Sequence, residues 1–295
     1  MIVLGPNKDT INTVLTEASK ILSLQLIGDI NGTSTSNSTN TFLGLEILRD
    51  AKNGTLTMHQ EKYTKNLLSR FNKLDIRPCK TPYNIGSKLR KSDTTADPKD
   101  ITLFQQNIGS LLYLSIKTRP DITYAVNRLS QYTNNPSKSH WDELDKIWGY
   151  LKKNPSIGIT YKATSLKNLF LKGYSDADYA NNLDNRRSTT GYLFTLGTKN
   201  LLSWNSTLQK TVALSTTEAE YMALKEASRE AIYLNNLLQS TISLLRLNIP
   251  TKIPVTLIDN QSALKLSENP EFHKRTKHID IAYHFIREVI NNKML

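Results

Sequence analysis

Three acidic residues near the C-terminal end of the chain occupy positions from which their carboxylates could converge. Asp176 ends the strand-like run 169–176, and Asp259 ends the strand-like run 255–259. Glu220 lies near the start of a long helical run. An isolated Asp at a strand end is usually a turn residue, so the hypothesis depends on all three acids together. Mg²⁺ prefers carboxylate oxygens, and a pair of ions about 3.5–4 Å apart needs several of them. The pattern therefore predicts a site for divalent metal ions.

Two glutamates compete for the helical position, and helical spacing separates them. Ser215 and Glu218 fit the capping-box pattern S-x-x-E, in which the Glu side chain bonds back to the helix start. Glu220 precedes an apolar stripe at helical spacing and so is predicted to face inward. The stripe consists of Ala223, Ala227, Ala231, Leu234 and Leu238. Glu218 is predicted to face outward, with Lys225 and Arg229. A buried acid needs a partner, and a metal ion is a good candidate.

Longer motifs surround the three acids and carry a resemblance to a known family. Five segments resemble the RNase H domain of copia-type LTR retrotransposon Pol polyproteins: Gly173–Ala180, Arg186–Tyr192, Gln209–Tyr221, Asp259–Ala263 and Arg275–Asp280. Three upstream segments resemble the end of that family's reverse transcriptase: Phe42–Glu46, Thr118–Ala125 and Trp141–Leu151. The resemblance covers nearly the whole chain, and the five long RNase H-like motifs in the family's order make it highly specific.

The resemblance implies an α/β chain of two domains. Residues 1–165 would be the C-terminal part of a reverse transcriptase, a mostly helical α+β remnant of the palm end and thumb or connection. Residues 166–295 would be an RNase H-like mixed-sheet α/β domain, C-terminally truncated before its last strand and helix. The family's polymerase Tyr-x-Asp-Asp hairpin would precede Met1–Pro6, so the polymerase active site is expected to be absent. The family's fourth RNase H carboxylate would lie beyond Leu295.

The activity implied by the resemblance is two-metal hydrolysis of RNA in RNA–DNA hybrids. Asp176 would bridge two Mg²⁺ ions, with Mn²⁺ as a possible substitute, and Glu220 and Asp259 would each bind one ion. RNA-directed DNA polymerase activity would belong to the full-length parent only. The alternative is a catalytically inactive nucleic-acid-binding remnant of a decayed element. A third reading is an interaction protein that has reused the fold.

Several side chains are candidates for other parts of such a site. Phosphate contacts are predicted for Arg186, Arg187, Lys210, Arg275 and Lys277, and contacts to the RNA 2′-OH for Asn260, Gln261, Ser215 and Thr217. Asp178 is a weaker ligand candidate than Asp176. Asp280 is read as a cap or first-turn acid of a helix, or as a substitute for the fourth carboxylate. The spacing of His273, His278 and His284 does not match H-x-x-x-H, which argues against a histidine metal site.

Hydrophobic periodicity predicts the elements that position these residues. Helices are predicted at 9–22, 61–74, 99–115, 120–132, 138–153, 215–239, 260–268 and 279–291. Strands are predicted at 24–30, 42–48, 54–59, 168–175, 190–196, 201–206 and 253–258, with a turn at Asn53-Gly54. A further strand at 157–161 could belong to either side of the domain boundary near residue 165.

The composition suits an anionic partner. The chain has 295 residues, a net charge of +12 and a pI of about 9.5. Residues 61–91 hold nine Lys or Arg and two acids, which predicts contacts to the phosphates of a hybrid or template–primer. Cys79 is the only cysteine, so no intramolecular disulfide can form.

The expected setting of the chain follows from the same features. No apolar run approaches the ~20 residues of a membrane span, and no secretory signal is recognised. The expected location is intracellular, with the parent element in cytoplasmic particles or the nucleus. The remainder of the parent polyprotein is an expected partner, and the oligomeric state is left open.

Overall fold

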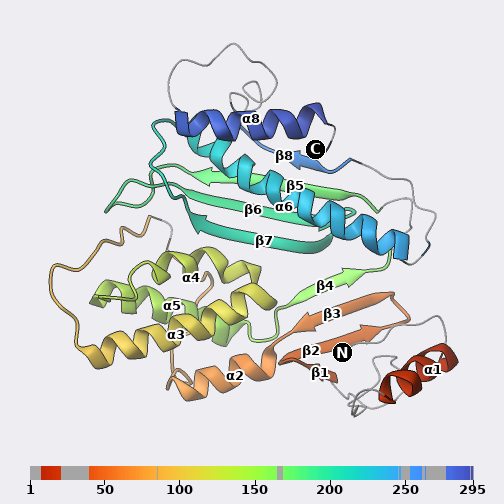
Figure 1. Ribbon diagram of the computed structural model, residues 1–295. Helices are drawn as coiled ribbons and strands as arrows, with labels where there is room; N and C mark the ends of the chain where they lie inside the picture. Colours follow the sequence, from red (N-terminus) through yellow and green to blue (C-terminus); the bar gives the residue numbers. More distant parts are fainter. Residues whose placement is uncertain are drawn as a thin grey trace.

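The computed structural model describes residues 8–20, 40–84, 86–164, 169–244, 246, 253–260, 263, 277–292 and 294. In these residues the protein is mixed α/β, with two four-stranded sheets and seven α-helices (Figure 1). The predicted strand at 24–30 and nearly all of the predicted helix at 260–268 lie outside the described residues.

The first sheet has the strand order β1-β2-β3-β4, with every neighbouring pair antiparallel. Its strands are β1 (Asn40–Phe42), β2 (Leu45–Asp50), β3 (Thr55–His59) and β4 (Ile159–Lys162). Gly54 has φ +62° in the turn between β2 and β3, where a residue without Cβ is favoured. The predicted hairpin is confirmed. The strand β4, whose place was open, pairs with β3.

Helices lie where the periodicity predicted them, but the helix predicted at 61–74 ends at Arg70 and the helix predicted at 120–132 begins with a 3-10 turn and ends at Ser130. They are α1 (Lys8–Ser19), α2 (Glu61–Arg70), α3 (Pro98–Lys117), α4 (Thr123–Ser130) and α5 (Lys138–Lys153), with a 3-10 turn η1 (Pro120–Ile122) before α4. Phe104, Leu111, Leu144 and Trp148 are fully buried between them, and each such side chain contributes about 1.5–3 kcal/mol. The Trp148 indole N–H donates to Asn107 Oδ1 at 3.0 Å. Trp148 is therefore a core residue.

His140 sits at the start of α5 with no solvent exposure. Its Nδ1 accepts from the Ser137 N–H at 2.8 Å, and its ring stacks on Tyr132 with centroids 4.1 Å apart. Burial lowers the pKa of His140 below 6.5, and the Arg128 charge acts in the same direction. The Arg90 carbonyl and the Asp184 carboxylate oppose that shift but do not outweigh it.

The lowered pKa of His140 predicts an acid-sensitive stability. The unfolded chain takes up this proton near pH 6.5 and the folded chain only at lower pH, so stability should fall as pH drops below 6.5. His140→Gln keeps a side chain that can accept the capping bond but does not titrate. We expect it to lower the melting temperature at pH 7.5 and to flatten the decline between pH 7 and 5. An equally steep decline in both proteins would contradict the assignment.

The second sheet has the order β7-β6-β5-β8. Its strands are β5 (Leu171–Asp178), β6 (Thr189–Leu196), β7 (Asn200–Leu208) and β8 (Val255–Leu257), with β8 parallel to β5 and the other pairs antiparallel. The helices of this part are α6 (Thr216–Leu244) and α8 (Lys277–Asn291). Figure 1 shows α6 lying across the sheet.

Close packing of α6 on the sheet depends on small residues. Ala227 and Ala231 are fully buried against Leu171 and Phe194, which confirms the inward stripe on the helix. A Cβ at Gly173 would lie 2.3 Å from Phe194 Cε1, so the ring can sit over β5 only because residue 173 is glycine. Within the described residues, no helix combines the length and apolarity that crossing a membrane requires.

Candidate metal centre

The three predicted ligands meet. One carboxylate oxygen from each of Asp176, Glu220 and Asp259 lies within 4.8 Å of the other two. Asp176 is in β5, and Asp259 follows the parallel strand β8 by two residues. Glu220 lies in the first turns of α6. The predicted clustering is confirmed. One detail of the prediction is wrong, because β5 continues for two residues beyond Asp176 and pairs that residue with Gly191.

Glu220 is the buried member of this cluster, with 8% of its surface exposed. Burial raises its pKa to about 7, and the charges of Asp176 and Asp259 add to the rise, while the Ala177 N–H opposes it. Its Oε2 is buried and has no hydrogen-bond partner among the described residues. An unpartnered buried carboxylate oxygen is costly in a protein interior. Three hard oxygen donors around such an atom fit a divalent cation such as Mg²⁺ or Mn²⁺.

Glu218 stays outside the metal cluster, but it is not on an exposed outer face. Its N–H donates to Ser215 Oγ at 3.1 Å, which confirms Ser215 as the helix cap. Its Oε2 accepts from the Leu214 N–H at 2.8 Å, and the residue is 7% exposed. The outward placement was therefore wrong, because the side chain folds back over the segment before α6 and is covered there.

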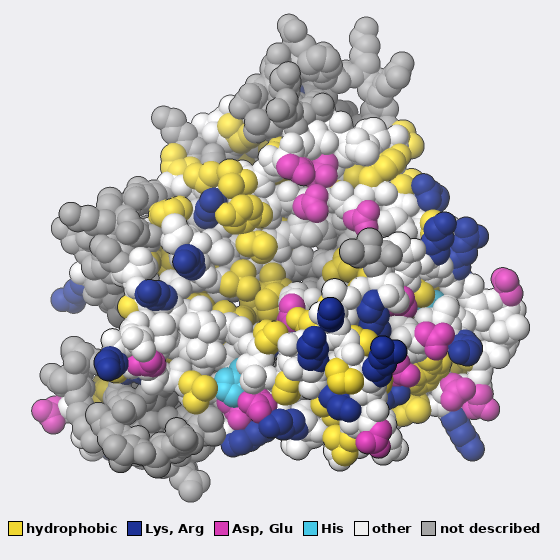
Figure 2. Space-filling model, turned by 180° about the vertical axis from the view of Figure 1, so that it is seen from behind, with side chains coloured by type: hydrophobic (Ala, Val, Ile, Leu, Met, Phe, Trp, Pro, Cys, Tyr) yellow, Lys and Arg dark blue, Asp and Glu magenta, His cyan; other side chains and the backbone are white. Residues whose placement is uncertain are grey.

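A cleft of about 540 Å³ opens beside the cluster, with Asp176 and Asp259 among its lining residues. Four of its lining residues stand side by side across the sheet in the pairing register: Leu257, Tyr174, Leu193 and Trp204. Figure 2 shows acidic and hydrophobic side chains gathered next to each other on the face seen there. The opposite wall comes from the first part of the chain, through Pro120, Thr123 and Tyr124. Residues before the second sheet and residues of that sheet therefore line the cleft together.

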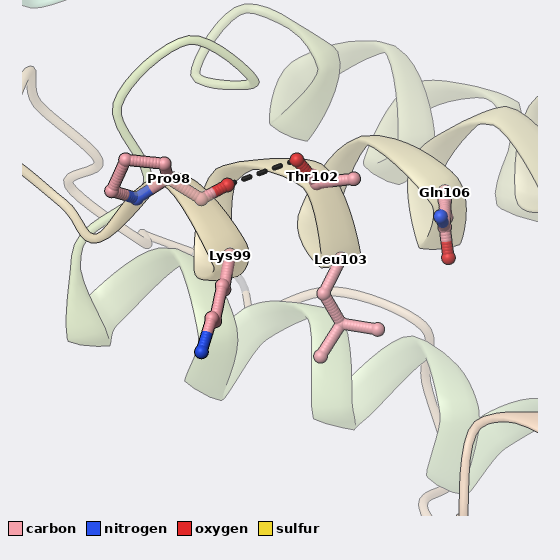
Figure 3. Close-up of a pocket in the computed structure, with 5 residues that line it drawn as sticks. All are labelled: Pro98, Lys99, Thr102, Leu103 and Gln106. Carbon is pink, nitrogen blue, oxygen red and sulfur yellow. Dashed lines mark hydrogen bonds between the residues drawn. The ribbon is translucent and has the colours of Figure 1, made fainter.

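A second hollow, of about 390 Å³, lies on the outer face of α3 (Figure 3). Its lining comes from this one helix: Pro98, Lys99, Thr102, Leu103 and Gln106. Thr102 Oγ1 donates to the Pro98 carbonyl at 2.9 Å, so this hydroxyl already has a partner. With no carboxylate or imidazole in its lining, this hollow offers no metal ligands comparable to the cluster.

Comparison with known proteins places the chain in a family. No protein-family model and no solved structure matches it. The retrovirus-related Pol polyprotein from transposon TNT 1-94 of Nicotiana tabacum is 38% identical over 300 residues, which cover 100% of this chain and 21% of that polyprotein. The chain belongs to the retrovirus-related Pol polyproteins of copia-like transposons. This confirms the resemblance that the motifs indicated.

Two further matches extend the comparison. The Pol polyprotein from transposon RE2 of Arabidopsis thaliana is 41% identical over 254 residues, 86% of this chain and 17% of that polyprotein. An uncharacterized mitochondrial protein of Arabidopsis thaliana is 32% identical over 230 residues, 78% of this chain and 89% of that protein. The chain spans 21% and 17% of the length of the two transposon polyproteins.

The other predicted contact residues of this Pol chain are spread more widely. Arg186 is exposed at φ +58° in the segment between β5 and β6, with Arg187 half-buried beside it, and Lys210 is exposed after β7. Asn260 Oδ1 accepts from the Ala263 N–H at 2.9 Å, so that oxygen already has a partner within the chain. Contacts of these four residues with nucleic acid therefore stay predictions.

Some predicted residues fall outside the described parts. Gln261 and Arg275 lie outside the described residues, and so do the side chains of Lys277 and Asp280. The backbone places Asp280 inside α8, three residues after its first residue. This position agrees with a first-turn acid and leaves its side-chain role open.

The sequence analysis missed the contribution of α4 to this site. Tyr124 lines the cleft, and its hydroxyl lies 3.4 Å from Asp178 Oδ2. The same Asp178 oxygen accepts from Asn181 Nδ2 at 2.7 Å, and Asp178 is not part of the metal cluster. The signal was present, because Tyr124 lies within a family motif, but α4 was considered only as part of the reverse transcriptase remnant.

Proposed function

We propose that this chain supplies the RNase H function of its retrotransposon: metal-dependent hydrolysis of the RNA strand in RNA–DNA hybrids. The observation that carries the proposal is the convergence of Asp176, Glu220 and Asp259 within 4.8 Å. Membership of the Pol family supports it, since the cluster falls in the segments that resemble RNase H. We assign the domain around the second sheet to an RNase H-like fold and the preceding part to the polymerase. The boundary near residue 165 stays a prediction.

The residues of the cluster divide the work by their exposure. Asp176 and Asp259 are exposed and line the cleft, whereas Glu220 is buried. Divalent ions bound there would lower the pKa of a water and stabilise the leaving oxygen. Glu220, with a pKa of about 7, is partly protonated at neutral pH without metal. Metal binding must therefore release a proton, and metal affinity should increase with pH.

Exposed Lys and Arg side chains form a basic surface that could bind the proposed nucleic-acid partner. Within the described chain, Arg77, Lys80, Lys88 and Arg90 are exposed and belong to no ion pair. Figure 2 shows Lys and Arg side chains gathered on part of the face seen there. Such side chains hold the phosphate backbone and carry no sequence specificity.

This surface predicts strongly salt-dependent binding of a hybrid duplex. If about five phosphates are neutralised, the logarithm of the binding constant should fall with log[salt] at a slope of roughly −4 to −5. Fluorescence anisotropy with a labelled hybrid in EDTA, from 50 to 200 mM KCl, measures the slope without cleavage. Double replacement of Lys88 and Arg90 by Gln should make the slope shallower by about 2. A slope near zero in the wild type would show that this basic surface does not contact the phosphates of the hybrid.

Cleavage is tested on three matched duplexes of one sequence: RNA–DNA, RNA–RNA and DNA–DNA. We expect cleavage of the RNA strand of the hybrid only, with Mg²⁺ or Mn²⁺ and not with EDTA. Binding of the hybrid without cleavage under any metal would favour the alternative, a nucleic-acid-binding remnant. Equal cleavage of all three duplexes would reject hybrid specificity.

A further inference from the structure

The segment 179–188 joins β5 to β6 immediately after the strand that carries Asp176. It is held in shape from within. Asn182, 3% exposed, accepts at Oδ1 from the N–H groups of Asp184 and Asn185, at 2.9 and 3.1 Å. The Ala180 N–H donates to Ser188 Oγ at 3.0 Å. These internal hydrogen bonds fix the shape of the segment. A contact to its middle therefore also helps to position the strand ends that it joins.

The outer contacts of this segment go to the first part of the chain. Arg128 Nη2, from α4, donates to the Asn181 carbonyl at 3.1 Å. Asn182 Nδ2 donates to Gln131 Oε1 at 2.7 Å, and Arg128 Nη1 donates to the same oxygen at 3.1 Å. In the middle of the segment, the Lys91 N–H donates to the Asp184 carboxylate at 3.0 Å. Residues at the end of α4 and in the chain before α3 therefore hydrogen-bond to the connection that follows the strand of Asp176.

Arg128 makes two of these hydrogen bonds, and its surroundings are unusual for a charged group. It is 3% exposed, and within the described residues no carboxylate lies within ion-pair distance of it. Its guanidinium bonds to neutral oxygens and lies over the Tyr132 ring, 5.9 Å from the centroid. A buried cation costs free energy that neutral partners offset only in part. A neutral side chain could fill that space at lower cost, so the cation has to be explained by the bonds it makes.

We propose that Arg128 is a positioning residue of the metal centre, acting from the polymerase-side helix α4 on the strand end that carries Asp176. The proposal rests on the proposed function. The coupling runs through one connected path. Arg128 holds the Asn181 carbonyl, the Asn181 side-chain oxygen accepts from Thr189 Oγ1 at 2.9 Å, and Thr189 pairs with Asp178 at the end of β5. Loosening the path at Arg128 would let this strand end, and with it Asp176, move relative to Glu220 on α6.

The test compares Arg128→Met with a matched variant, Arg119→Met. Arg119 is also buried in the first part of the chain, at 1% exposure, and donates to Asp121 and to the Asn154 carbonyl. Among its bonds in the described chain, none reaches the segment 179–188. Both variants should lower the melting temperature, so loss of stability does not separate them. Gln131→Met, which removes the oxygen that accepts from both Arg128 and Asn182, is a milder second variant in case Arg128→Met does not fold.

Two measurements are made on the full chain: amide hydrogen exchange of residues 177–190 without metal, and Mn²⁺ binding by calorimetry. Arg128→Met should speed exchange in this segment by roughly tenfold relative to Arg119→Met and weaken Mn²⁺ binding by about tenfold, the lower end of the cost of losing an outer-shell partner. Gln131→Met should shift both in the same direction by less. Arg119→Met should leave Mn²⁺ affinity unchanged.

The outcomes separate this proposal from the proposed function. Faster exchange with unchanged Mn²⁺ affinity would overturn the positioning role, because the segment would then move without moving Asp176. Equal exchange in the two arginine variants would overturn the path itself. If the wild type binds no Mn²⁺, the proposed function fails and the role of Arg128 at a metal centre fails with it. If the wild type binds Mn²⁺ but cleaves no hybrid, hydrolysis fails while the Mn²⁺ arms still decide the role of Arg128.

Discussion

Replacing Asp176 by Asn should abolish metal-dependent cleavage of an RNA–DNA hybrid. The substitution keeps the size of the side chain and removes the charge of one of the two exposed oxygen ligands. Loss of an outer-shell partner alone typically costs 10–100-fold in metal affinity or activity, so losing a direct ligand should cost more than about 100-fold. The rate of RNA-strand cleavage under single-turnover conditions with saturating Mg²⁺ measures this directly.

Asp142→Asn is the control for the change in net charge. Asp142 is an exposed residue of α5 that pairs only loosely with Lys138, at 3.6 Å. It should cleave at the wild-type rate. Hybrid binding in EDTA should be equal or slightly tighter in both variants, because each removes one negative charge. Cleavage that survives in Asp176→Asn would place the active site elsewhere in the chain or in a contaminant.

The metal cluster was predictable because each ligand lies in a short, strongly patterned run. Alternation places Asp176 on one face of its strand, and the alanine stripe places Glu220 on the inward side of its helix. The parallel pairing of β8 with β5 then brings Asp259 to the same sheet edge. Glu218 shows the limit of this reasoning. Periodicity predicts the direction of a side chain from its own helix, but not the segment before α6 that covers it.

The contacts of α4 with the connection between β5 and β6 could not be predicted in the same way. Arg128 and Asn181 are 53 residues apart, and neither lies in a pattern that specifies the other. A buried arginine in an amphipathic helix looks, in sequence, like any basic residue on a solvated face. Only tertiary packing shows that it points into a neighbouring connection. For the same reason, assigning α4 to the polymerase part concealed its contribution of Tyr124 to the cleft.

Glu220→Gln should stabilise the protein without metal and prevent its stabilisation by metal. The unfolded chain ionises Glu220 near pH 4.5, whereas the folded chain does so near pH 7. A raised carboxyl pKa means that the charged form destabilises the fold, by nothing below pH 4.5 and by the full amount above pH 7. The difference between these pKa values corresponds to about 3 kcal/mol at pH 8. Gln is nearly isosteric and uncharged, so it removes this penalty.

Thermal or urea unfolding at pH 8 and pH 4.5, with and without Mn²⁺, measures both effects. In EDTA at pH 8 the variant should unfold at a higher temperature than the wild type, and at pH 4.5 the two should nearly coincide. With Mn²⁺ at 100 times its dissociation constant, the wild type should gain about 2.7 kcal/mol and the variant should gain little. Glu226→Gln, a half-buried residue of the same helix that pairs with Arg229 at 3.1 Å, should change neither result. A Glu220→Gln protein that is less stable than the wild type at pH 8 in EDTA would show that Glu220 is ionised for a structural reason, and its buried carboxylate would then no longer support a metal at this cluster.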